Sequence, residues 1–332
     1  MFCFVINRSC ERILYALLAG LLLIALMLSL TSEASGDADK QKITIVLSDD
    51  LPVYQGFVTE FRQTLVNEHL DIFSNVITAD AYVRRQKEIS KDTGLFITVG
   101  VKATLSVVDS AYGKPVYSTL MPKVTFSKIK KNRRKKSTRL SAVFLDQPVA
   151  RQLSLIRYAL PQVRRIGVLV PADGEGSGLE KSLEIGARKA GYNLILERLA
   201  SEKSTLPVLD RIFSKADVLL AVPETGLIDR KLASNILLTS YRYRKPVVAY
   251  SQAYVRAGAL LAVYSSPRDI GHYTALKIAG MSKRSWQLPK ASYSDQFTVT
   301  VNRWLARSMG LKIKSGRWLK NRMLNEEGIK TE

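Results

Sequence analysis

The chain has 332 residues and a formal net charge of +21, and 46% of its residues are hydrophobic. This apolar fraction is normal for a globular protein and argues against bulk disorder, and the length allows one large α/β unit or two lobes. Both cysteines, Cys3 and Cys10, lie near the N-terminus, so thiol chemistry and a cysteine metal site are excluded for the rest of the chain.

The N-terminal residues have the pattern of a secretory signal. Arg8 and Arg12 flank the start of an apolar run at residues 13–30, and Ser32 and Ala34 are the small residues that a signal peptidase reads. We predict a signal peptide at residues 1–34, cleavage after Ala34 and export to the periplasm. An uncleaved anchor is the alternative, because an apolar run of about 18 residues just spans a bilayer.

The first predicted elements alternate between strands and helices. Short apolar, β-branched runs favour buried strands, and the segments between them have helical spacing. This alternation predicts a parallel sheet with helices on both faces. The strands are expected at residues 43–48, 71–79, 95–100 and 114–118, and the helices at 55–67 and about 103–108.

A strongly basic run follows at residues 128–136, which carry seven positive charges. The composition favours a solvated loop that its own charges extend; contact with an acidic partner or an anionic lipid surface is the alternative. No nucleic-acid partner is expected, because no aromatic residues are interleaved to stack on bases and because the chain has an export signal.

The alternation then repeats in the second half of the chain. It begins with a helix whose apolar residues recur at three- and four-residue spacing, so that one face packs on a sheet. A last strand and helix are expected at residues 297–310. The other predicted helices lie at 149–160, 179–190, 206–213 and 229–241, and the predicted strands at 165–170, 192–198, 217–222 and 246–250.

Two similar α/β halves predict two lobes with a cleft between them. The chain is expected to cross between the lobes at residues 140–147 and 259–265, which makes a hinge of several strands. Polar side chains at the strand ends would face the cleft, where open α/β sheets bind ligands. We place the first lobe at residues 41–142 plus 266–288 and the second lobe at 144–264 plus 289–332.

Residues 245–277 are the clearest example of polar side chains at strand ends. One apolar run ends at Ser251 and Gln252, and the next ends at Tyr264 and Ser265. Taken singly, such residues are most often caps or turn residues, but as a set they suit a hydrogen-bonding cleft.

The other strands end in the same way. Glu224 suits either a ligand amine or the positive dipole of the next helix, and Lys102 would add positive charge beside a carboxylate. The candidate ligand-binding residues are Ser48, Tyr54, Gly100, Lys102, Thr104, Ser118, Thr119, Ser177, Glu224, Thr225, Ser251, Gln252, Tyr264 and Ser265.

Enzymatic signatures are missing from the sequence. The two histidines, His69 and His272, lie in different halves and in no metal-ligand spacing. The glycine-rich residues 174–178 match neither a nucleophile elbow nor a dinucleotide-binding loop, so a flexible cleft loop is favoured. We therefore expect no catalysis, no metal and no cofactor.

Four segments carry a family pattern: residues 146–170, 217–229, 245–275 and 300–311, the last of which reads TVNRWLARSMGL. Together they resemble the periplasmic substrate-binding proteins of ABC transporters, in the group that includes tryptophan and phenylalanine binders. The resemblance implies the two-lobed periplasmic-binding fold, with a parallel sheet flanked by helices in each lobe. The ligand loops that it implies are residues 100–104, 118–119, 224–225, 251–252 and 264–265.

The resemblance has two departures. The family often has Thr-Pro-Ala where this chain has Val-Lys-Ala at residues 101–103, and its loop at residues 128–136 is usually shorter and less charged. Both departures concern the class of ligand and leave the expected fold unchanged.

The main hypothesis is a monomeric, periplasmic solute-binding component of an ABC-type import system in a Gram-negative cell. It would bind a zwitterionic or anionic, amino-acid-like ligand in the cleft and deliver it to an ABC permease in the inner membrane. The alternative is a sensory ligand-binding protein that docks on a membrane receptor or partner.

Overall fold

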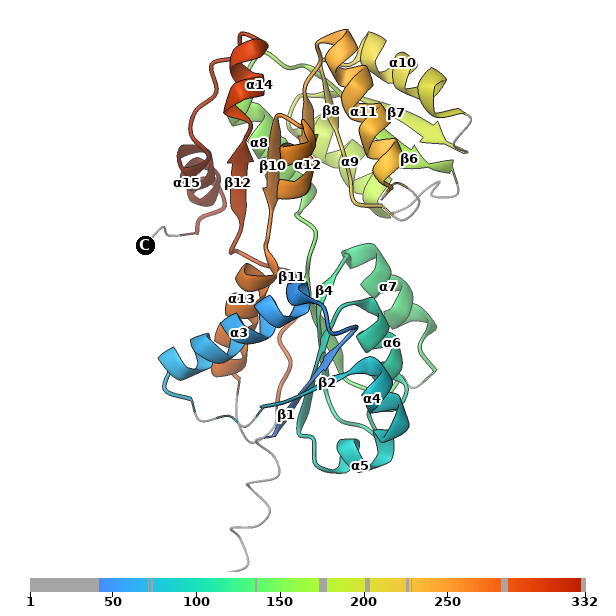
Figure 1. Cartoon of the computed structure of the whole chain (residues 1–332), viewed down its shortest axis with the longest axis vertical. Helices are drawn as coiled ribbons and strands as arrows, with labels where there is room; N and C mark the ends of the chain where they lie inside the picture. The colour runs from blue at the N-terminus through green and yellow to red at the C-terminus, as the bar shows by residue number, and fades with distance from the viewer. Residues whose placement is uncertain are drawn as a thin grey trace, which may run out of the picture.

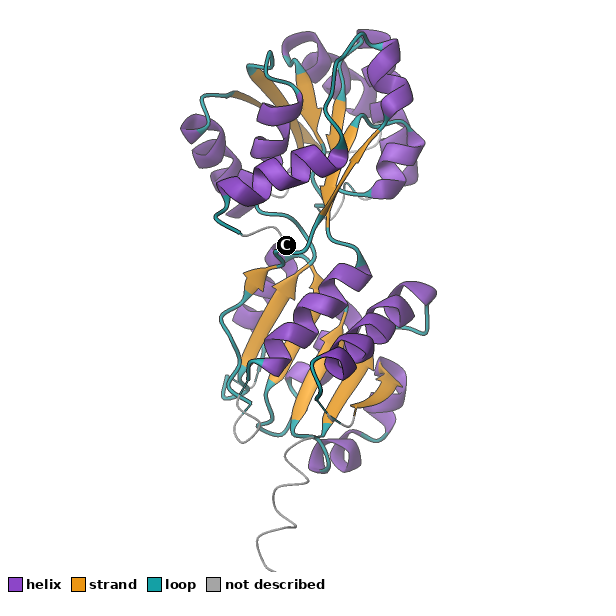
Figure 2. Ribbon diagram, turned by 90° about the vertical axis from the view of Figure 1, so that its left-hand side faces the viewer, coloured by secondary structure: helices purple, strands orange, loops and turns teal. Residues whose placement is uncertain are grey.

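The structure is a computed structural model that describes residues 42–329, except 71, 73, 135, 173–177, 201–203, 225–226, 228 and 282–285. Two lobes, each built on a six-stranded sheet, lie at the two ends of the molecule and meet at a narrow waist (Figures 1 and 2). The predicted two-lobed α/β fold is confirmed. The predicted signal peptide at residues 1–34 lies outside the described residues.

The first lobe contains the sheet β11-β5-β4-β3-β1-β2, in which all neighbouring strands are parallel. Its strands are β1 (Ile43–Leu47), β2 (Ser74–Thr78), β3 (Leu95–Val99), β4 (Val116–Met121), β5 (Leu140–Phe144) and β11 (Ser292–Tyr293). Its helices are α3 (Pro52–Asn67), α4 (Ala79–Arg84), α5 (Gln86–Lys91), α6 (Val101–Val108), α7 (Lys123–Asn132) and α13 (Pro267–Ala279).

The second lobe contains the sheet β12-β10-β9-β8-β6-β7, which is parallel except for the antiparallel edge strand β12. Its strands are β6 (Arg165–Pro171), β7 (Asn193–Leu199), β8 (Val218–Leu220), β9 (Val247–Ala249), β10 (Leu261–Tyr264) and β12 (Thr298–Val301). Its helices are α8 (Val149–Ala159), α9 (Gly178–Lys189), α10 (Thr205–Lys215), α11 (Arg230–Tyr243), α12 (Gln252–Ala257), α14 (Arg303–Ser308) and α15 (Gly316–Glu326).

The chain passes between the lobes after β5, after β10 and after β11, and these three passages form the waist (Figure 1). The expected crossings at residues 140–147 and 259–265 contain the first two. The third passage follows β11 (Ser292–Tyr293), which pairs with β5 in the first sheet. The expected domain boundary at residue 289 had placed these two residues in the second lobe. A strand of two residues has too little pattern to be seen in the sequence.

The core of the first lobe shows how a doubly covered parallel strand distributes its side chains. Ile43, Ile45 and Leu47 of β1 pack with residues of α3 and α13, whereas Val46 packs with residues of α4 and α6. Both faces are buried because helices cover both sides of the sheet, as is usual for parallel sheets. Among the described residues, no helix combines the length and the apolar character that crossing a membrane requires.

Gly271 lies where α13 packs on α3. A Cβ atom at Gly271 would lie 2.5 Å from the carbonyl oxygen of Phe57, so the two backbones leave no room for a side chain. We expect Gly271→Ala to lower the free energy of unfolding by about 1–3 kcal/mol through overpacking, measured by urea denaturation. Gly280→Ala, at the end of the same helix with its nearest atoms 3.8 Å away, is the control. Equal losses in the two variants would contradict this account.

Candidate functional site

A cavity of about 510 Å³ lies between the lobes, beside the first passage. It follows the carboxyl ends of β4, β5 and β8 and the N-termini of α7, α8 and α9, which is where parallel sheets bind ligands. Both lobes and the passage therefore supply its lining. The lining residues are Pro122, Lys123, Val124, Ser127, Lys128, Asp146, Gln147, Pro148, Val149, Gln152, Gly178, Leu179, Ser182, Val222, Pro223, Glu224 and Tyr293.

The cavity holds charged groups of both signs on opposite sides. Lys123 and Lys128 come from α7 of the first lobe, Glu224 comes from the loop after β8 of the second lobe, and Asp146 lies in the passage. The first turn of α9, at Gly178 and Leu179, adds the positive end of a helix dipole. The arrangement suits a small solute that carries both an amine and a carboxylate.

The carboxyl groups of this cavity are partly desolvated. Burial raises the pKa of Glu224, the Lys128 ammonium opposes this rise, and the carboxylates of Asp146 and Glu180 add to it. Burial also raises the pKa of Asp146, although the backbone N–H of Lys123 donates a hydrogen bond of 2.8 Å to that carboxylate. A ligand amine between them would stabilise both in their charged form.

Glu224 is the one predicted ligand residue, among those that the structure describes, that lines this cavity. Ser177 and Thr225 lie outside the described residues. The remaining predicted residues lie in three places: the buried interior of the first lobe, the surface beside it, and the second lobe near the waist.

Thr104, Ser118 and Thr119 lie inside the first lobe and are fully buried. The Thr98 hydroxyl lies 2.8 Å from the Thr104 hydroxyl and donates a hydrogen bond of 3.1 Å to Ser118 Oγ. Thr119 Oγ1 donates to the carbonyl of Thr98 at 3.1 Å. These hydroxyl groups join β3, β4 and α6, so in this structure they stabilise the lobe, and their contact with a solute stays a prediction.

Thr104→Val tests whether this hydroxyl cluster is structural. Valine keeps the shape of the threonine side chain but removes the hydroxyl group, so the buried hydroxyls of Thr98 and Ser118 lose a hydrogen-bond partner. We therefore expect the free energy of unfolding to fall by about 1–3 kcal/mol. Solute affinity should change by less than roughly two-fold, because the side chain does not line the cavity. Thr59→Val, on the exposed face of α3, is the control and should be neutral. A large loss of affinity, measured calorimetrically, would instead assign Thr104 to the ligand site.

Ser48 and Gly100 meet at the N-terminus of α6, with the Tyr54 side chain beside them. Ser48 Oγ accepts a hydrogen bond of 3.1 Å from the backbone N–H of Ala103. Gly100 has a φ of 92°, and a Cβ there would lie 2.5 Å from Ser48 Oγ and 3.2 Å from the Tyr54 hydroxyl. Glycine is therefore required here by both conformation and space.

Lys102 is directed toward another element of the first lobe. Its ammonium forms an ion pair of 2.8 Å with Asp80 of α4, and both side chains are more than half exposed. The hydrogen bond from Lys102 lowers the pKa of Asp80. In this structure the predicted positive charge is thus paired within the lobe.

The second-lobe residues have structural partners of their own. Ser251 caps α12 by accepting a hydrogen bond of 3.2 Å from the N–H of Tyr254. Gln252 is exposed. The Tyr264 hydroxyl lies 3.1 Å from Thr300 Oγ1 across the β10–β12 pair. None of the three lines the interlobe cavity in the described part of the chain, and their ligand role stays a prediction.

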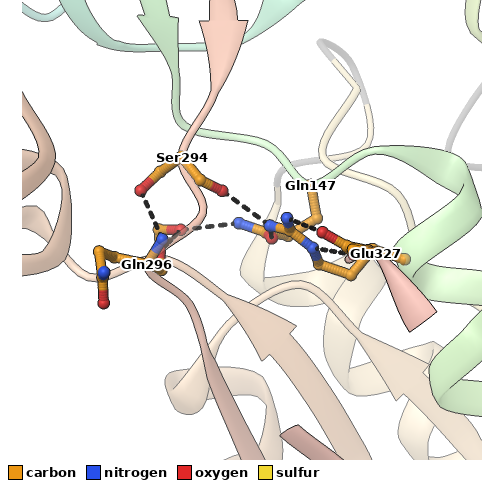
Figure 3. A network of polar contacts seen from close by, with 6 residues as sticks. Gln147, Ser294, Gln296 and Glu327 are labelled. Carbon is orange, nitrogen blue, oxygen red and sulfur yellow. Dashed lines mark hydrogen bonds and ion pairs between the residues drawn. The ribbon is translucent and has the colours of Figure 1, made fainter. Parts of the chain in front are cut away.

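Ser265 belongs to a hydrogen-bond network that joins the three passages. Figure 3 shows this network with Gln147, Ser294, Gln296 and Glu327 labelled. Gln147 Nε2 donates to Ser265 Oγ at 2.9 Å, and Ser265 Oγ donates to the carbonyl of Gln296 at 2.6 Å. The network therefore connects the first, second and third passages through side chains that are fixed by hydrogen bonds.

Arg151 of α8 anchors this network. Its Nη1 donates to Gln147 Oε1 at 2.7 Å and to the carbonyl of Ser294 at 2.8 Å, and its other nitrogens bind the Glu327 carboxylate at 2.5 and 2.7 Å (Figure 3). The guanidinium also lies 4.2 Å from the ring centroid of Phe297. Only 3% of the Arg151 side chain is exposed, whereas 28% of the Glu327 side chain is exposed. The hinge therefore contains a buried guanidinium that makes a bidentate ion pair with a partly exposed carboxylate at the end of α15.

The basic run differs from the expected solvated loop, because its first residues complete helix α7 (Lys123–Asn132). Phe126 and Ile129 are buried and fix the helix on the sheet, which places Lys128 at the cavity. Arg134 pairs with Asp109 farther along. The sequence analysis did not identify Lys128 and Asp146 as site residues. The three-residue spacing of the apolar residues 126 and 129 was the available signal that this segment is a helix, and the helix is what places Lys128 at the cavity.

No cluster of three or more His, Cys, Asp or Glu side chains suited to a metal ion occurs in the described ranges.

Two lobes that enclose a charged cavity at a waist of three passages define a protein of the solute-binding class. The particular family follows from the sequence: a family model described as "ABC transporter substrate binding protein" matches residues 73–315, and the chain belongs to this family. No curated protein matches the chain.

Solved structures support the same fold. The ligand-free, open structure of CD0873, a substrate-binding protein with adhesive properties from Clostridium difficile, is 18% identical, with a TM-score of 0.67 and coverage of 82% of this chain and 96% of that one. An ABC domain in complex with L-Trp from Streptococcus pneumonia is 17% identical, with a TM-score of 0.55 and coverage of 82% and 95%. At these identities the likeness shows the fold.

Family membership settles the broad class of activity. The family and the similar structures are solute-binding proteins and not enzymes, as the missing enzymatic signatures predict. Membership also implies a small-molecule ligand and an ABC permease as partner.

Proposed function

We propose that this chain is the periplasmic solute-binding component of an ABC-type import system, and that its ligand is a zwitterionic, amino-acid-like solute. The observation that carries the proposal is the opposed pair of charges in the interlobe cavity, with Lys128 on the first lobe and Glu224 on the second. A solute that pairs its carboxylate with Lys128 and its amine with Glu224 contacts both lobes at once.

Contact with both lobes explains how binding changes the conformation. The cavity is accessible in the present arrangement. A bound zwitterion places its carboxylate beside Lys128 of one lobe and its amine beside Glu224 of the other lobe. Such a ligand has a higher affinity for the closed form than for the open form, and it shifts the population by that difference. The L-Trp complex of the Streptococcus protein is an example of an amino acid bound to this fold.

A thermal melt with a metabolite panel tests the proposal. We expect at least one L-amino acid to raise the melting temperature, with stabilisation of about 2.7 kcal/mol at a concentration of about 100 Kd. Nucleosides and organic acids without an amine should give smaller shifts, because they leave Glu224 unpaired. If amino acids, nucleosides and organic acids all leave the melting curve unchanged, the proposal is wrong.

Export to the periplasm is a separate part of the proposal. It rests on the apolar run at residues 13–30 and the small residues that follow it. Mass spectrometry of protein from the periplasmic fraction should show a mature chain that begins at Ser35. Intact chains in the membrane fraction would favour the anchor instead.

A further inference from the structure

A second concave surface lies on the second lobe, away from the interlobe cavity. This groove has a volume of about 880 Å³ and is lined by residues of α11, α12 and α14 and of the loop after β9. Its apolar lining residues include Leu237, Leu238, Tyr241, Tyr250, Tyr254 and Trp304. We call it the α11–α12–α14 groove.

The edge of the groove leaves large apolar side chains in water. Leu238 is 68% exposed, Tyr241 70% and Trp304 68%. Soluble proteins rarely leave contiguous apolar side chains exposed in this way unless a partner covers them. A small molecule is normally enclosed by its pocket, so side chains that are two-thirds exposed point to a larger occupant.

Two polar side chains of the groove serve as helix caps. The Asp229 carboxylate caps α11 at the N–H of Leu232 at 2.8 Å. Asn302 Oδ1 caps α14 at the N–H of Leu305 at 2.9 Å. The groove therefore offers an occupant a mainly apolar and aromatic surface.

Apart from Asp229, whose carboxylate caps α11, the charged residues of the groove and its rim are basic. The segments that form this face, residues 230–268 and 296–325, contain no Asp or Glu. Arg230 lines the groove, and Arg256 and Arg303 are exposed next to the lining residues Ala257 and Trp304. Within the described part of the chain, no carboxylate forms an ion pair with Arg230, Arg256 or Arg303.

We propose that the α11–α12–α14 groove binds an acidic amphipathic helix of a protein partner. Such a helix presents apolar side chains three and four residues apart to the groove and carboxylates to the arginines of the rim. An anionic bilayer fits less well, because the lining includes Tyr254, which is only 8% exposed, and a flat surface does not reach a buried side chain. The site is separate from the solute cavity and does not depend on the identity of the solute.

Peptide binding to the intact protein tests the proposal. The probe is a synthetic helical peptide with leucines three and four residues apart and glutamates on both flanks; the matched peptide has lysine in place of each glutamate. Covering Trp304 should shift its fluorescence to shorter wavelength, and Trp304→Phe should abolish that shift. We expect the acidic peptide to bind at least about ten-fold more tightly than the basic one, and less tightly at high salt.

Paired variants locate the site. Arg256→Glu combined with Arg303→Glu should weaken binding of the acidic peptide by about ten-fold or more. Arg188→Glu combined with Lys189→Glu, at the exposed end of α9, is the control and should leave binding unchanged. Equal affinity for the two peptides, or equal effects of the two double variants, overturns the proposal. Binding to phosphatidylglycerol vesicles with no binding of the acidic peptide also overturns it, in favour of a lipid surface.

Discussion

Arg151→Ala should lower the free energy of unfolding by about 1–3 kcal/mol, the cost of leaving buried hydrogen-bond acceptors without their donor. The substitution removes four hydrogen bonds at once and leaves the Gln147 amide oxygen, the Ser294 carbonyl and the Glu327 carboxylate without this donor. Because these acceptors lie in two passages and at the end of α15, the loss should loosen the hinge as well as the second lobe. Urea denaturation measures the stability.

Arg157→Ala is a matched control for Arg151→Ala. Arg157 lies on the same helix and pairs with Glu326, the neighbour of Glu327, but 45% of its side chain is exposed. An exposed pair contributes about 0–1 kcal/mol, so this variant should be nearly as stable as the parent protein. If both variants lose the same stability, the buried hinge network has no special role.

Glu224→Gln should weaken the binding of an amino-acid solute by about 2–5 kcal/mol, which is roughly a factor of thirty or more. The amide keeps the size of the side chain but removes the negative charge that would pair with the ligand amine.

Lys128→Met should weaken binding of the same solute by removing the charge on the opposite wall. Lys130→Met, two residues farther along α7 and absent from the cavity lining, is the control. Isothermal titration calorimetry separates the three variants.

The pH dependence follows from the raised pKa of Glu224. Burial holds its folded pKa above the unfolded value, so the folded protein loses stability as the pH rises from the ordinary Glu range through the raised pKa. Solute affinity has the opposite dependence, since only the carboxylate pairs with an amine, and it should fall as the pH drops through that pKa. Glu224→Gln should therefore bind solute poorly and be at least as stable as the parent protein without ligand at neutral pH. A destabilised variant would contradict this account.

Local sequence pattern was sufficient for the architecture. The β-branched runs at residues 43–48 and 95–100 correspond to β1 and β3, and the helix expected at 149–160 is α8 (Val149–Ala159). These elements are visible because a parallel strand buried on both faces is almost continuously apolar, and a helix on a sheet is apolar at fixed spacing. Shared periodicity in the two halves of the chain was enough to predict two lobes.

The site could not be found in the same way, because it depends on contacts between distant segments. Thr104 and Ser118 end up bonded to each other inside the lobe, since helix α6 packs on the sheet and brings the Thr104 hydroxyl to Ser118 of β4. Lys128 was hidden in a run of like charges, and only the burial of Phe126 and Ile129 decides that this part is a helix facing the cavity. Local sequence cannot tell a polar residue that satisfies its neighbour from one that remains free for a ligand.

Closure of the lobes on the solute is the central claim, and one distance tests it. Lys131 lies in the last turn of α7 and Lys181 in the first turns of α9, and both are exposed on the two lobes that face the cavity. Nitroxide labels on cysteines at these positions, in a chain with Cys3 and Cys10 replaced by serine, report their separation by electron–electron resonance. We predict a shorter distance when the amino acid that raises the melting temperature is added. An unchanged distance at saturating amino acid would contradict the account.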